Sequence, residues 1–320
     1  MERKISLYKL LLLWLLLPAA LLSSCTERSL ELRPEPEPEP EPVAIRLYTG
    51  IRTRAAVDAF EGTPICVAYG NAPGVYTECW DGVATGNEIT LSPARYYPQD
   101  GSRVYLRSFY PPAPMNADGT LIYTLTGEED LLMTSECVGS LDSPFTMDEE
   151  RQLTHRHLLT QLSFSLKLDV ADDGKYSVRA LSLNGLTRQV TLSLLTEELS
   201  SDVSTLTVTV YEAPADNFGL PFEDGVADLP GYVLVQPEAE FTIDLRLAVD
   251  DNPANDLVYT NLPVQFEGGV GEGGVAYTVK VDIPDPVSPA PVEVSATATV
   301  TSWKDGNGGS GEIVPDKEKK

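Results

Sequence analysis

Residues 162–170 read LSFSLKLDV. Apolar side chains occupy every second position of this stretch, with serine, lysine and aspartate between them. Successive side chains of a strand point to opposite faces, so strict alternation predicts one face on a core and the other in water. The same pattern recurs at residues 206–210, 241–249, 275–283 and 292–300. Turn-forming residues separate these runs, and no helical periodicity exceeds about two turns, so we expect an all-β protein of antiparallel β-sandwiches.

The length of the chain indicates two such sandwiches. It has 320 residues, of which roughly 260 carry the strand pattern. Residues 144–151 are polar and rich in turn formers, and a long strand pattern follows them. We therefore expect an N-terminal sandwich at residues 43–150 and a C-terminal sandwich at residues 151–303.

The charge balance excludes one class of partner. The chain has 23 Lys and Arg against 48 Asp and Glu, a net charge of −25. Phosphate backbones repel a polyanion of this size, so a nucleic-acid binder is ruled out. Because the carboxylates are so numerous, most of them are expected to cover a solvated surface.

Residues 1–24 have the organisation of an export signal. A basic flank precedes the apolar segment Leu10–Leu17, and the apolar stretch out to Leu22 spans 13 residues, fewer than the roughly 20 of a bilayer span. Leu22–Cys25 resembles a bacterial lipobox, which predicts lipidation of Cys25 as the first mature residue; the alternative is an ordinary secreted protein. Removal of residues 1–24 takes away three basic residues and one acidic residue and leaves a net charge of −27.

Two segments are expected to lie outside the sandwiches. Residues 25–42 comprise the lipidated cysteine and a linker in which proline and glutamate alternate from Pro34 to Pro42. Such a linker is extended and semi-rigid, at about 3.1 Å per residue. Residues 304–320 contain four glycines and mixed charges and are expected to form a flexible tail.

Catalytic and metal chemistry find little support. The chain has two histidines, His155 and His157, which share one face of a predicted strand. Zinc sites need three or four ligands, and no third ligand is apparent nearby, so a pair at the edge of the core is the simpler interpretation. The sequence contains neither a G-x-S-x-G nucleophile motif nor a phosphate loop. We expect no enzyme, no metal and no cofactor.

The cysteines permit one bridge at most. Once Cys25 is lipidated, Cys66, Cys79 and Cys137 remain. Cys66 and Cys79 are placed to pair across a hairpin, but buried free thiols explain the sequence equally well. Both alternatives stay open.

Several local patterns occur in an order that resembles a known family. They are the isolated strand at residues 43–49, the segment 53–56, the apolar strand 60–69, the Tyr- and Pro-rich pair 96–111, the segment 130–133, and the histidine-led run 155–166. Together they resemble fimbrillins of the Mfa-like/FimA-like superfamily, the surface subunits of type V pili in Gram-negative anaerobes. Thr63 stands where the family often has Asp, a surface turn position that puts little in doubt.

The resemblance implies fold, assembly and location. It implies two transthyretin-like β-sandwich domains and a non-enzymatic pilus subunit at the cell surface, delivered to the outer membrane by its lipid. It also implies that an arginine-specific protease removes a short first strand, and that a strand from a neighbouring fimbrial subunit, usually from its C-terminal region, fills the vacated groove.

The implied first strand has a suitable pattern. Val43, Ile45 and Leu47 share one face, so we expect a removable edge strand over apolar pockets. The preferred cut lies between Arg54 and Ala55, with Arg52 as the alternative. A solvated loop arginine is the simpler interpretation of Arg54 without the resemblance.

The last alternating run is the candidate donor. If it is donated, Val292, Val294 and Val300 fill the neighbour's groove. The alternative is that this strand belongs to its own domain and only the tail is free, so the subunit either propagates a fibre or caps one.

A rival function is a lipoprotein that stays anchored and binds glycan, host protein or a bacterial surface without polymerising. Its aromatic platform would comprise Tyr96, Tyr97, Tyr105, Phe109 and Tyr110, although core packing is the commoner fate of such residues. A first strand bonded on both sides, and impossible to excise, favours this rival.

Overall fold

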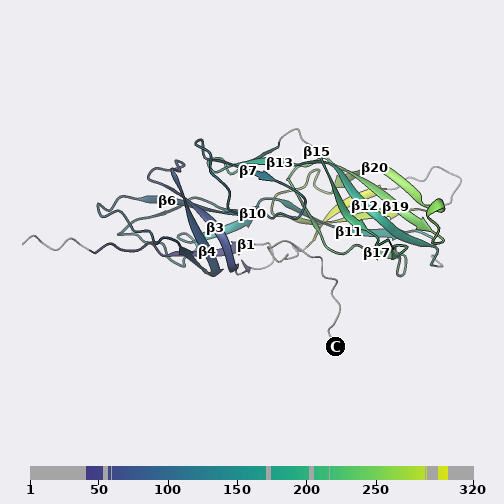
Figure 1. The fold of residues 1–320 in the computed structure, drawn as a ribbon, viewed down its shortest axis with the longest axis horizontal. Helices are drawn as coiled ribbons and strands as arrows, with labels where there is room; N and C mark the ends of the chain where they lie inside the picture. Colours follow the sequence, from purple (N-terminus) through teal and green to yellow (C-terminus); the bar gives the residue numbers. More distant parts are fainter. Residues whose placement is uncertain are drawn as a thin grey trace, which may run out of the picture. The chain divides into compact units, whose positions relative to one another are not determined.

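The all-β prediction is confirmed. The computed structural model describes residues 41–52, 57–58, 60–170, 174–201, 205–215, 217–284, 286 and 295–301. Contacts divide the chain into residues 1–41 and 42–320, and the second unit is the subject here. Its described residues form 22 strands and one short 3-10 helix, η1 (Pro253–Asn255) (Figure 1). In this part of the chain, no helix has the length and apolar character needed to cross a membrane.

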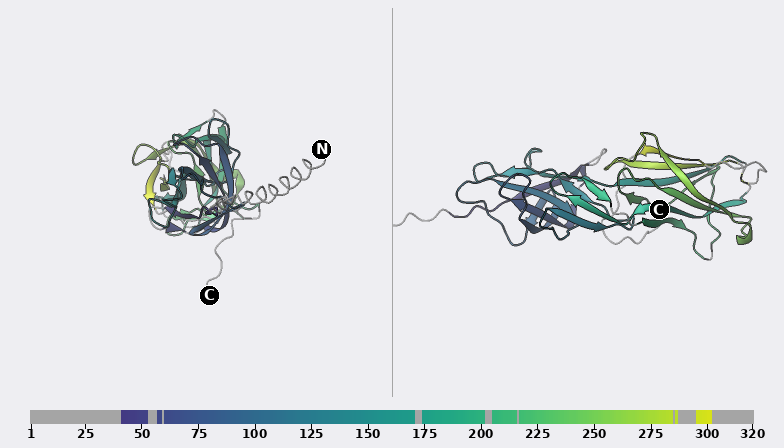
Figure 2. Two further views of the ribbon diagram at one scale, coloured as in Figure 1. Left: turned by 90° about the vertical axis from the view of Figure 1, so that its left-hand side faces the viewer. Right: turned by 90° about the horizontal axis from the view of Figure 1, so that it is seen from above.

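The first sheet closes on itself. It consists of β1 (Leu47–Arg52), β2 (Val57–Asp58), β3 (Phe60–Gly70), β4 (Glu78–Gly86), β5 (Glu88–Leu91), β6 (Val104–Tyr110), β8 (Leu132–Thr134), β9 (Cys137–Gly139) and β10 (Leu153–His157). The order is β10-β8-β6-β3-β4-β5-β1-β2, with β9 beside β6, and an additional pairing of β10 with β1 completes a ring. In the end-on view of Figure 2 (left), the blue strands of this sheet curve around an interior.

Strand β3 shows why this sheet is covered on both sides. Ile65 and Val67 point into the interior of the ring, where they pack in one apolar cluster. Cys66 and Ala68 point outward into a different apolar cluster. A strand that is buried on both faces carries a continuous apolar run rather than an alternating one.

A small third sheet covers the outer face. It consists of β7 (Thr120–Thr124), β13 (Gln189–Ser193) and β14 (Leu199–Ser201), in the order β14-β13-β7. Leu121, Val190 and Leu192 from this sheet are fully buried in the outer cluster. The third sheet therefore joins segments about 70 residues apart in the sequence.

The second large sheet contains the alternating stretch at residues 162–170. Its strands are β11 (Thr160–Leu168), β12 (Tyr176–Thr187), β15 (Thr205–Glu212), β16 (Leu220–Pro221), β17 (Val226–Asp228), β18 (Val233–Val235), β19 (Thr242–Val249), β20 (Leu257–Phe266), β21 (Ala276–Ile283) and β22 (Ser295–Thr301). The path runs β15-β12-β19-β20-β22-β21-β11-β17, with β16 beside β12 and β18 beside β11. Leu162, Phe164 and Leu166 of β11 are at most 2% exposed, as their alternation predicts, but Ser163 on the opposite face is 5% exposed, so the expectation of a solvated face is wrong at that end of the strand.

The strand pairing changes sheet after the predicted boundary at residue 150. β10 still belongs to the first sheet, where it pairs with β8 and β1. β11 begins the second sheet, so the change falls at Leu158 and Leu159. β13 and β14 then return to pair with β7. The division into sandwiches at 43–150 and 151–303 stays a prediction.

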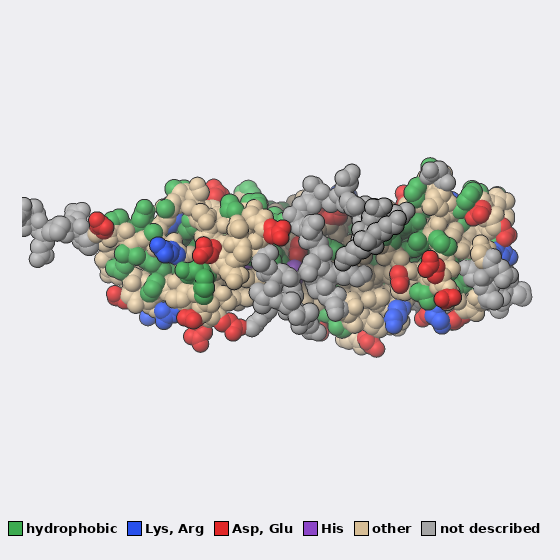
Figure 3. All heavy atoms as spheres, turned by 90° about the horizontal axis from the view of Figure 1, so that it is seen from below, with side chains coloured by type: hydrophobic (Ala, Val, Ile, Leu, Met, Phe, Trp, Pro, Cys, Tyr) green, Lys and Arg blue, Asp and Glu red, His purple; other side chains and the backbone are tan. Residues whose placement is uncertain are grey.

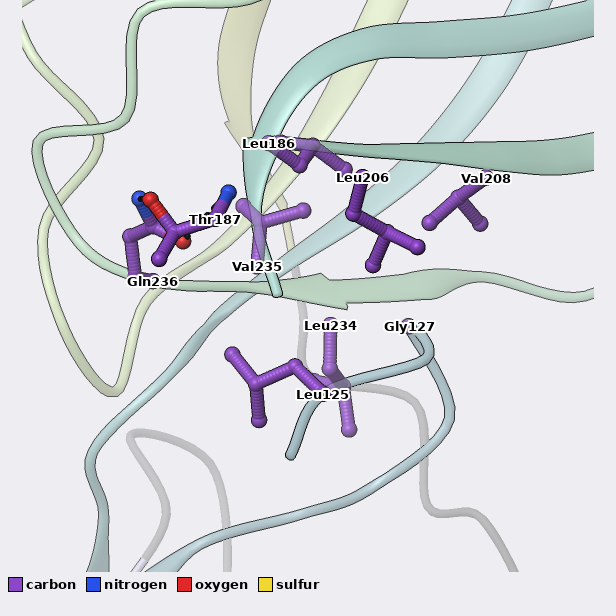
Figure 4. Close-up of a pocket in the computed structure, with 9 residues that line it drawn as sticks. All are labelled: Leu125, Gly127, Leu186, Thr187, Leu206, Val208, Leu234, Val235 and Gln236. Carbon is purple, nitrogen blue, oxygen red and sulfur yellow. Dashed lines mark hydrogen bonds between the residues drawn. The ribbon is translucent and has the colours of Figure 1, made fainter. Parts of the chain in front are cut away.

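A tight junction joins the loop after β7 to the second sheet. Figure 4 shows Gly127 and Leu125 facing Leu234 of β18, with Leu206 and Val208 of β15 also lining the hollow. The N–H of Leu234 donates to the carbonyl of Gly127 at 2.7 Å. The hollow between these residues is too small for a ligand, so it is a packed contact.

The charged side chains are dispersed. In Figure 3, red acidic side chains are scattered over the visible face among hydrophobic and neutral ones. This distribution agrees with the expected solvated surface of a chain with 48 carboxylates.

Candidate functional site

The first strand closes the ring between two neighbours. On one flank, the N–H of Ile45 donates to Arg95 O at 2.8 Å and the N–H of Thr49 donates to Asn87 O at 2.9 Å. On the other flank, Thr49–Arg52 pair in parallel with Leu153–Arg156 of β10. β2 also pairs with the end of β1. The expectation of an edge strand is therefore wrong: segment 43–52 is bonded on one flank in its first half and on the other in its second half.

Two of the three residues predicted on the buried face of the first strand are buried. Ile45 is 7% and Leu47 is 2% exposed, and both pack in the interior cluster of the ring. Val43 is 48% exposed, which corrects its predicted place on the buried face. Val43 precedes β1, and its carbonyl accepts from the N–H of Tyr97 at 3.0 Å, while its side chain stays in solvent.

Below the aliphatic residues, β1 contributes a polar side chain to the interior. Thr49 is 1% exposed, and its hydroxyl donates to the carbonyl of Leu153 at 2.8 Å. The same oxygen lies 2.9 Å from Nδ1 of His155. On the far side of the imidazole, Nε2 lies 3.0 Å from the hydroxyl oxygen of Ser108 on β6, and the same oxygen lies 3.1 Å from Cys66 O. The imidazole thus bridges β1 and β6 through the interior.

The environment of His155 keeps it neutral. The residue is fully buried, and the ring of Phe60 contacts it edge-on with centroids 5.1 Å apart. Burial lowers the pKa of His155 to about 3. A neutral imidazole carries one N–H, so one of its two nitrogens must accept a hydrogen bond.

The second histidine has a different partner. Nδ1 of His157 lies 2.7 Å from Oδ2 of Asp130. The residues that the structure describes contain no group of three or more His, Cys, Asp or Glu that could hold a metal ion. The two histidines share a face of β10 but serve separate contacts.

Part of the predicted site lies outside the described residues. This holds for Cys25, Arg54, Ala55, Val292 and Val294. Arg52 is the last residue of β1, but its side chain is not described. The lipidation site and the cut stay predictions.

The candidate donor strand is held inside its own sheet. β22 pairs in parallel with β20 and antiparallel with β21. Ala296 and Ala298 are buried, whereas Val300 is 54% exposed. Donation of this strand would require it to leave both neighbours.

The structure resolves the cysteine alternatives in favour of a bridge. Cys66 on β3 and Cys79 on β4 form a disulfide, with Cα atoms 6.1 Å apart. Cys137 is a free, buried thiol, and burial raises its pKa to about 11.

The aromatic residues that the rival function would use for binding do not share one exposed surface. Phe109 is fully buried and Tyr97 is 3% exposed, with its hydroxyl accepting from the N–H of Phe145 at 3.0 Å. Tyr96 is 51% exposed, and Tyr105 and Tyr110 are half-buried. Phe109 and Tyr97 are therefore packing residues of the first sheet and are not available to an exposed aromatic platform.

Thr49 and Ser108 belong to the site but were not singled out from the sequence. Thr49 continues the inward row of Ile45 and Leu47, so its position on that face could have been extrapolated from the alternation. Ser108 carried no signal, because its contact with His155 spans 47 residues.

Comparisons with known proteins agree with this architecture. The sequence matches the family described as fimbrillin-like over residues 49–303. A solved structure from Bacteroides uniformis, which its description assigns to cell adhesion, shares 16% identity and a TM-score of 0.53, covering 83% of this chain and all of that one. A second, from Bacteroides ovatus and similarly described, shares 14% identity and a TM-score of 0.51, covering 84% of this chain and all of that one. These likenesses support the fold. The search of curated proteins found no match.

Proposed function

The chain belongs to the fimbrillin-like family, and from this membership we propose that it is a fimbrial subunit that assembles by donor-strand exchange at its first strand. The family places it among cell-surface fimbrial and adhesion subunits. In the proposed mechanism, a protease removes the first strand and a strand of another fimbrial subunit takes its place.

The observation that carries the proposal is the position of β1 at the seam of the ring. Its removal would free β5 and the 95–97 segment on one side and β10 on the other. Unpaired strand edges are templates for strand addition, because the main-chain donors and acceptors need partners. The two edges follow one another along the slot, so an incoming strand would be bonded on one flank in its first half and on the other in its second half.

The interior supplies the apolar part of the driving force. Removal of segment 43–52 would expose the pockets of Ile45 and Leu47. Burial of an aliphatic side chain contributes about 1.5–3 kcal/mol, so refilling both pockets is worth several kcal/mol. This makes an empty slot unfavourable and an exchanged one stable.

Processing would act at the end of β1. We infer a cut by an arginine-specific protease between Arg54 and Ala55, or after Arg52 at the end of the strand. Cys25 lies upstream of both, so either cut would separate the subunit from its lipid and from the outer membrane. Lipidation itself follows from the lipobox at Leu22–Cys25.

Whether this subunit also donates a strand depends on β22. Because β22 is paired on both sides, we propose that this subunit accepts a strand through its slot and donates one through Val292, Val294 and Val300 only if β22 first leaves its sheet. A subunit that accepts without donating would end a fibre rather than extend it.

The test follows the N-terminus of the protein shed from cells. We expect surface-shed and polymerised protein to begin at Ala55, or at Thr53 if Arg52 is cut. Substitution of both arginines (Arg52→Gln, Arg54→Gln) should block shedding and polymer formation, whereas the matched control Arg46→Gln, in the first segment itself, should not. A polymer whose subunits still carry a lipidated Cys25 would refute the mechanism.

One observation favours the rival, a tethered receptor that keeps its lipid. β1 is bonded on both flanks, as a permanent strand would be. The same experiment separates the two functions, because the receptor predicts that the working form retains Cys25 and that the double arginine variant behaves normally.

A further inference from the structure

We propose that His155 and Ser108 select the strand that occupies the slot, so that it accepts an extended segment with aliphatic residues at two successive inward positions and a hydroxyl residue at the third. This inference rests on the proposed strand exchange and specifies the partner. In the resident strand, Ile45, Leu47 and Thr49 fill these three positions.

The wall of the slot is not uniformly apolar. The interior cluster receives Ile45 and Leu47, but the next inward position meets His155 Nδ1 at 2.9 Å and the carbonyl of Leu153 at 2.8 Å. All three residues at this level, Thr49, His155 and Leu153, are at most 1% exposed. Water cannot replace a missing partner there without opening the structure, so the incoming strand must supply it.

A hydroxyl is the group that fits both contacts. It donates one hydrogen bond, here to Leu153 O, and accepts another, here from His155 Nδ1. Both contacts are made at once when Nδ1 carries the proton; in the other tautomer the hydroxyl rotates to donate to Nδ1 instead of Leu153 O. A methyl group in its place would take the hydroxyl partner away from the buried imidazole and leave it its backbone contacts with Leu153 and Gly50 on this side, which is costly.

The polar contact would also fix the register. A strand that slips by one residue turns Arg46 and Tyr48 toward the core, which the alternation already forbids. A slip by two keeps the apolar face inward, so hydrophobicity alone discriminates weakly against it. Such a slip would place Leu47 or Ile51 against His155 and remove the hydroxyl that contacts both the imidazole and the Leu153 carbonyl. A single buried polar contact can specify register in this way, as buried asparagine does in coiled coils.

Ser108 holds the imidazole in place from the other side. Its hydroxyl lies 3.0 Å from His155 Nε2, and its backbone N–H donates to the hydroxyl of Thr134 at 2.9 Å. Ser108 itself is fully buried on β6. The selecting group therefore stands on β6 and β10, both of which remain when β1 departs.

The experiment uses the full-length protein, cleaved by an arginine-specific protease and challenged with synthetic peptides of residues 43–52. The peptides are the native sequence, Thr49→Ser, Thr49→Val, and a swapped peptide carrying Leu47→Thr with Thr49→Leu. Displacement of the resident strand is followed by fluorescence anisotropy. We expect the native and Ser peptides to compete, and the Val and swapped peptides to be about tenfold to a hundredfold weaker.

A reciprocal variant distinguishes selection from simple stabilisation. In His155→Leu, the preference should invert, so that the Val peptide competes at least as well as the native one. The peptide series on the unaltered protein stands even if this variant does not fold.

The outcomes separate the two ideas. If no peptide displaces the strand, the proposed exchange is wrong. If all four displace it equally well, exchange stands and selection by His155 is overturned.

Discussion

Nη2 of Arg107 lies 2.8 Å from Oε1 of Glu197, and this ion pair joins β6 of the first sheet to the turn between β13 and β14. Arg107 is 4% exposed, and its Nε also donates to the hydroxyl of Tyr76 at 3.1 Å. The second oxygen of Glu197 lies 2.7 Å from Nη2 of Arg156, whose side chain is 46% exposed. One carboxylate thus serves a buried arginine and a solvated one.

The two arginines should respond differently to loss of their shared partner. Glu197→Gln leaves the buried charge of Arg107 without compensation, and we expect a loss of roughly 2–3 kcal/mol in the free energy of unfolding. Arg156→Gln removes only a solvated contact and should cost less than about 1 kcal/mol. Urea denaturation of both variants measures the difference. Equal losses would show that the Arg107 pair is not effectively buried in solution.

The strands were predictable because their signal is local. Alternation alone placed β11, β15, β19 and β21, since one buried face imposes a period of two wherever the strand lies in the fold. Closure of the first sheet has no such signal. It depends on Thr49–Arg52 meeting β10, about 100 residues later, and no local pattern marks that pairing.

The candidate site was predictable to the same extent. Alternation correctly predicted that Ile45 and Leu47 are buried. It wrongly predicted the same of Val43, because the pattern cannot show where a strand leaves the ring. The sequence predicts His155 at the edge of the core, and the structure buries it fully, but its partner Ser108 is fixed only by the packing of β6 against β10. The edge position of the first strand was wrong for the same reason as the missed closure.

The disulfide should contribute measurably to stability. Cys66 and Cys79 are 13 positions apart in the sequence. In the chain-entropy account, closing a loop of that size stabilises the folded state by about 3 kcal/mol. We expect Cys66→Ala with Cys79→Ala, or reduction of the native protein, to lower the free energy of unfolding by roughly this amount. Cys137→Ala is the control, because its effect should be insensitive to reductant. Reductant without effect on the native protein would contradict the bridge.

Protonation of His155 should destabilise the fold in acid. Its pKa is about 3 in the folded protein because of burial, against about 6.5 when unfolded, so the unfolded chain binds the extra proton. Its contribution to stability is complete above pH 6.5 and falls by about 1.4 kcal/mol per pH unit toward pH 3. The groups found to face the imidazole are the hydroxyls of Thr49 and Ser108, the backbone of Leu153 and Gly50 and the ring of Phe60, and none of these is charged.

The measurement compares unfolding free energies of the native protein and His155→Asn from pH 7 to pH 4. Titration of the many carboxylates is common to both proteins and cancels in the difference. We expect the native protein to lose stability more steeply below pH 6.5, so that the two curves converge. Parallel curves would mean that the imidazole reaches solvent.

Gly127 should be intolerant of any side chain. Its φ of +104° lies where L-residues are strained, and a Cβ there would come within 2.9 Å of Val208 Cγ1 and 3.0 Å of Val233 Cγ1. Strain and overpacking each cost about 1–3 kcal/mol, so we expect Gly127→Ala to lower the free energy of unfolding by about 3 kcal/mol.

Gly119→Ala is the matched control, since its φ is +76° but no atom lies within 4 Å of the new Cβ. It should lose only the backbone strain, about 1 kcal/mol. If both variants lose the same amount, the loop at residues 125–127 yields to the added methyl group, and the Gly127–Leu234 hydrogen bond does not hold it against the second sheet.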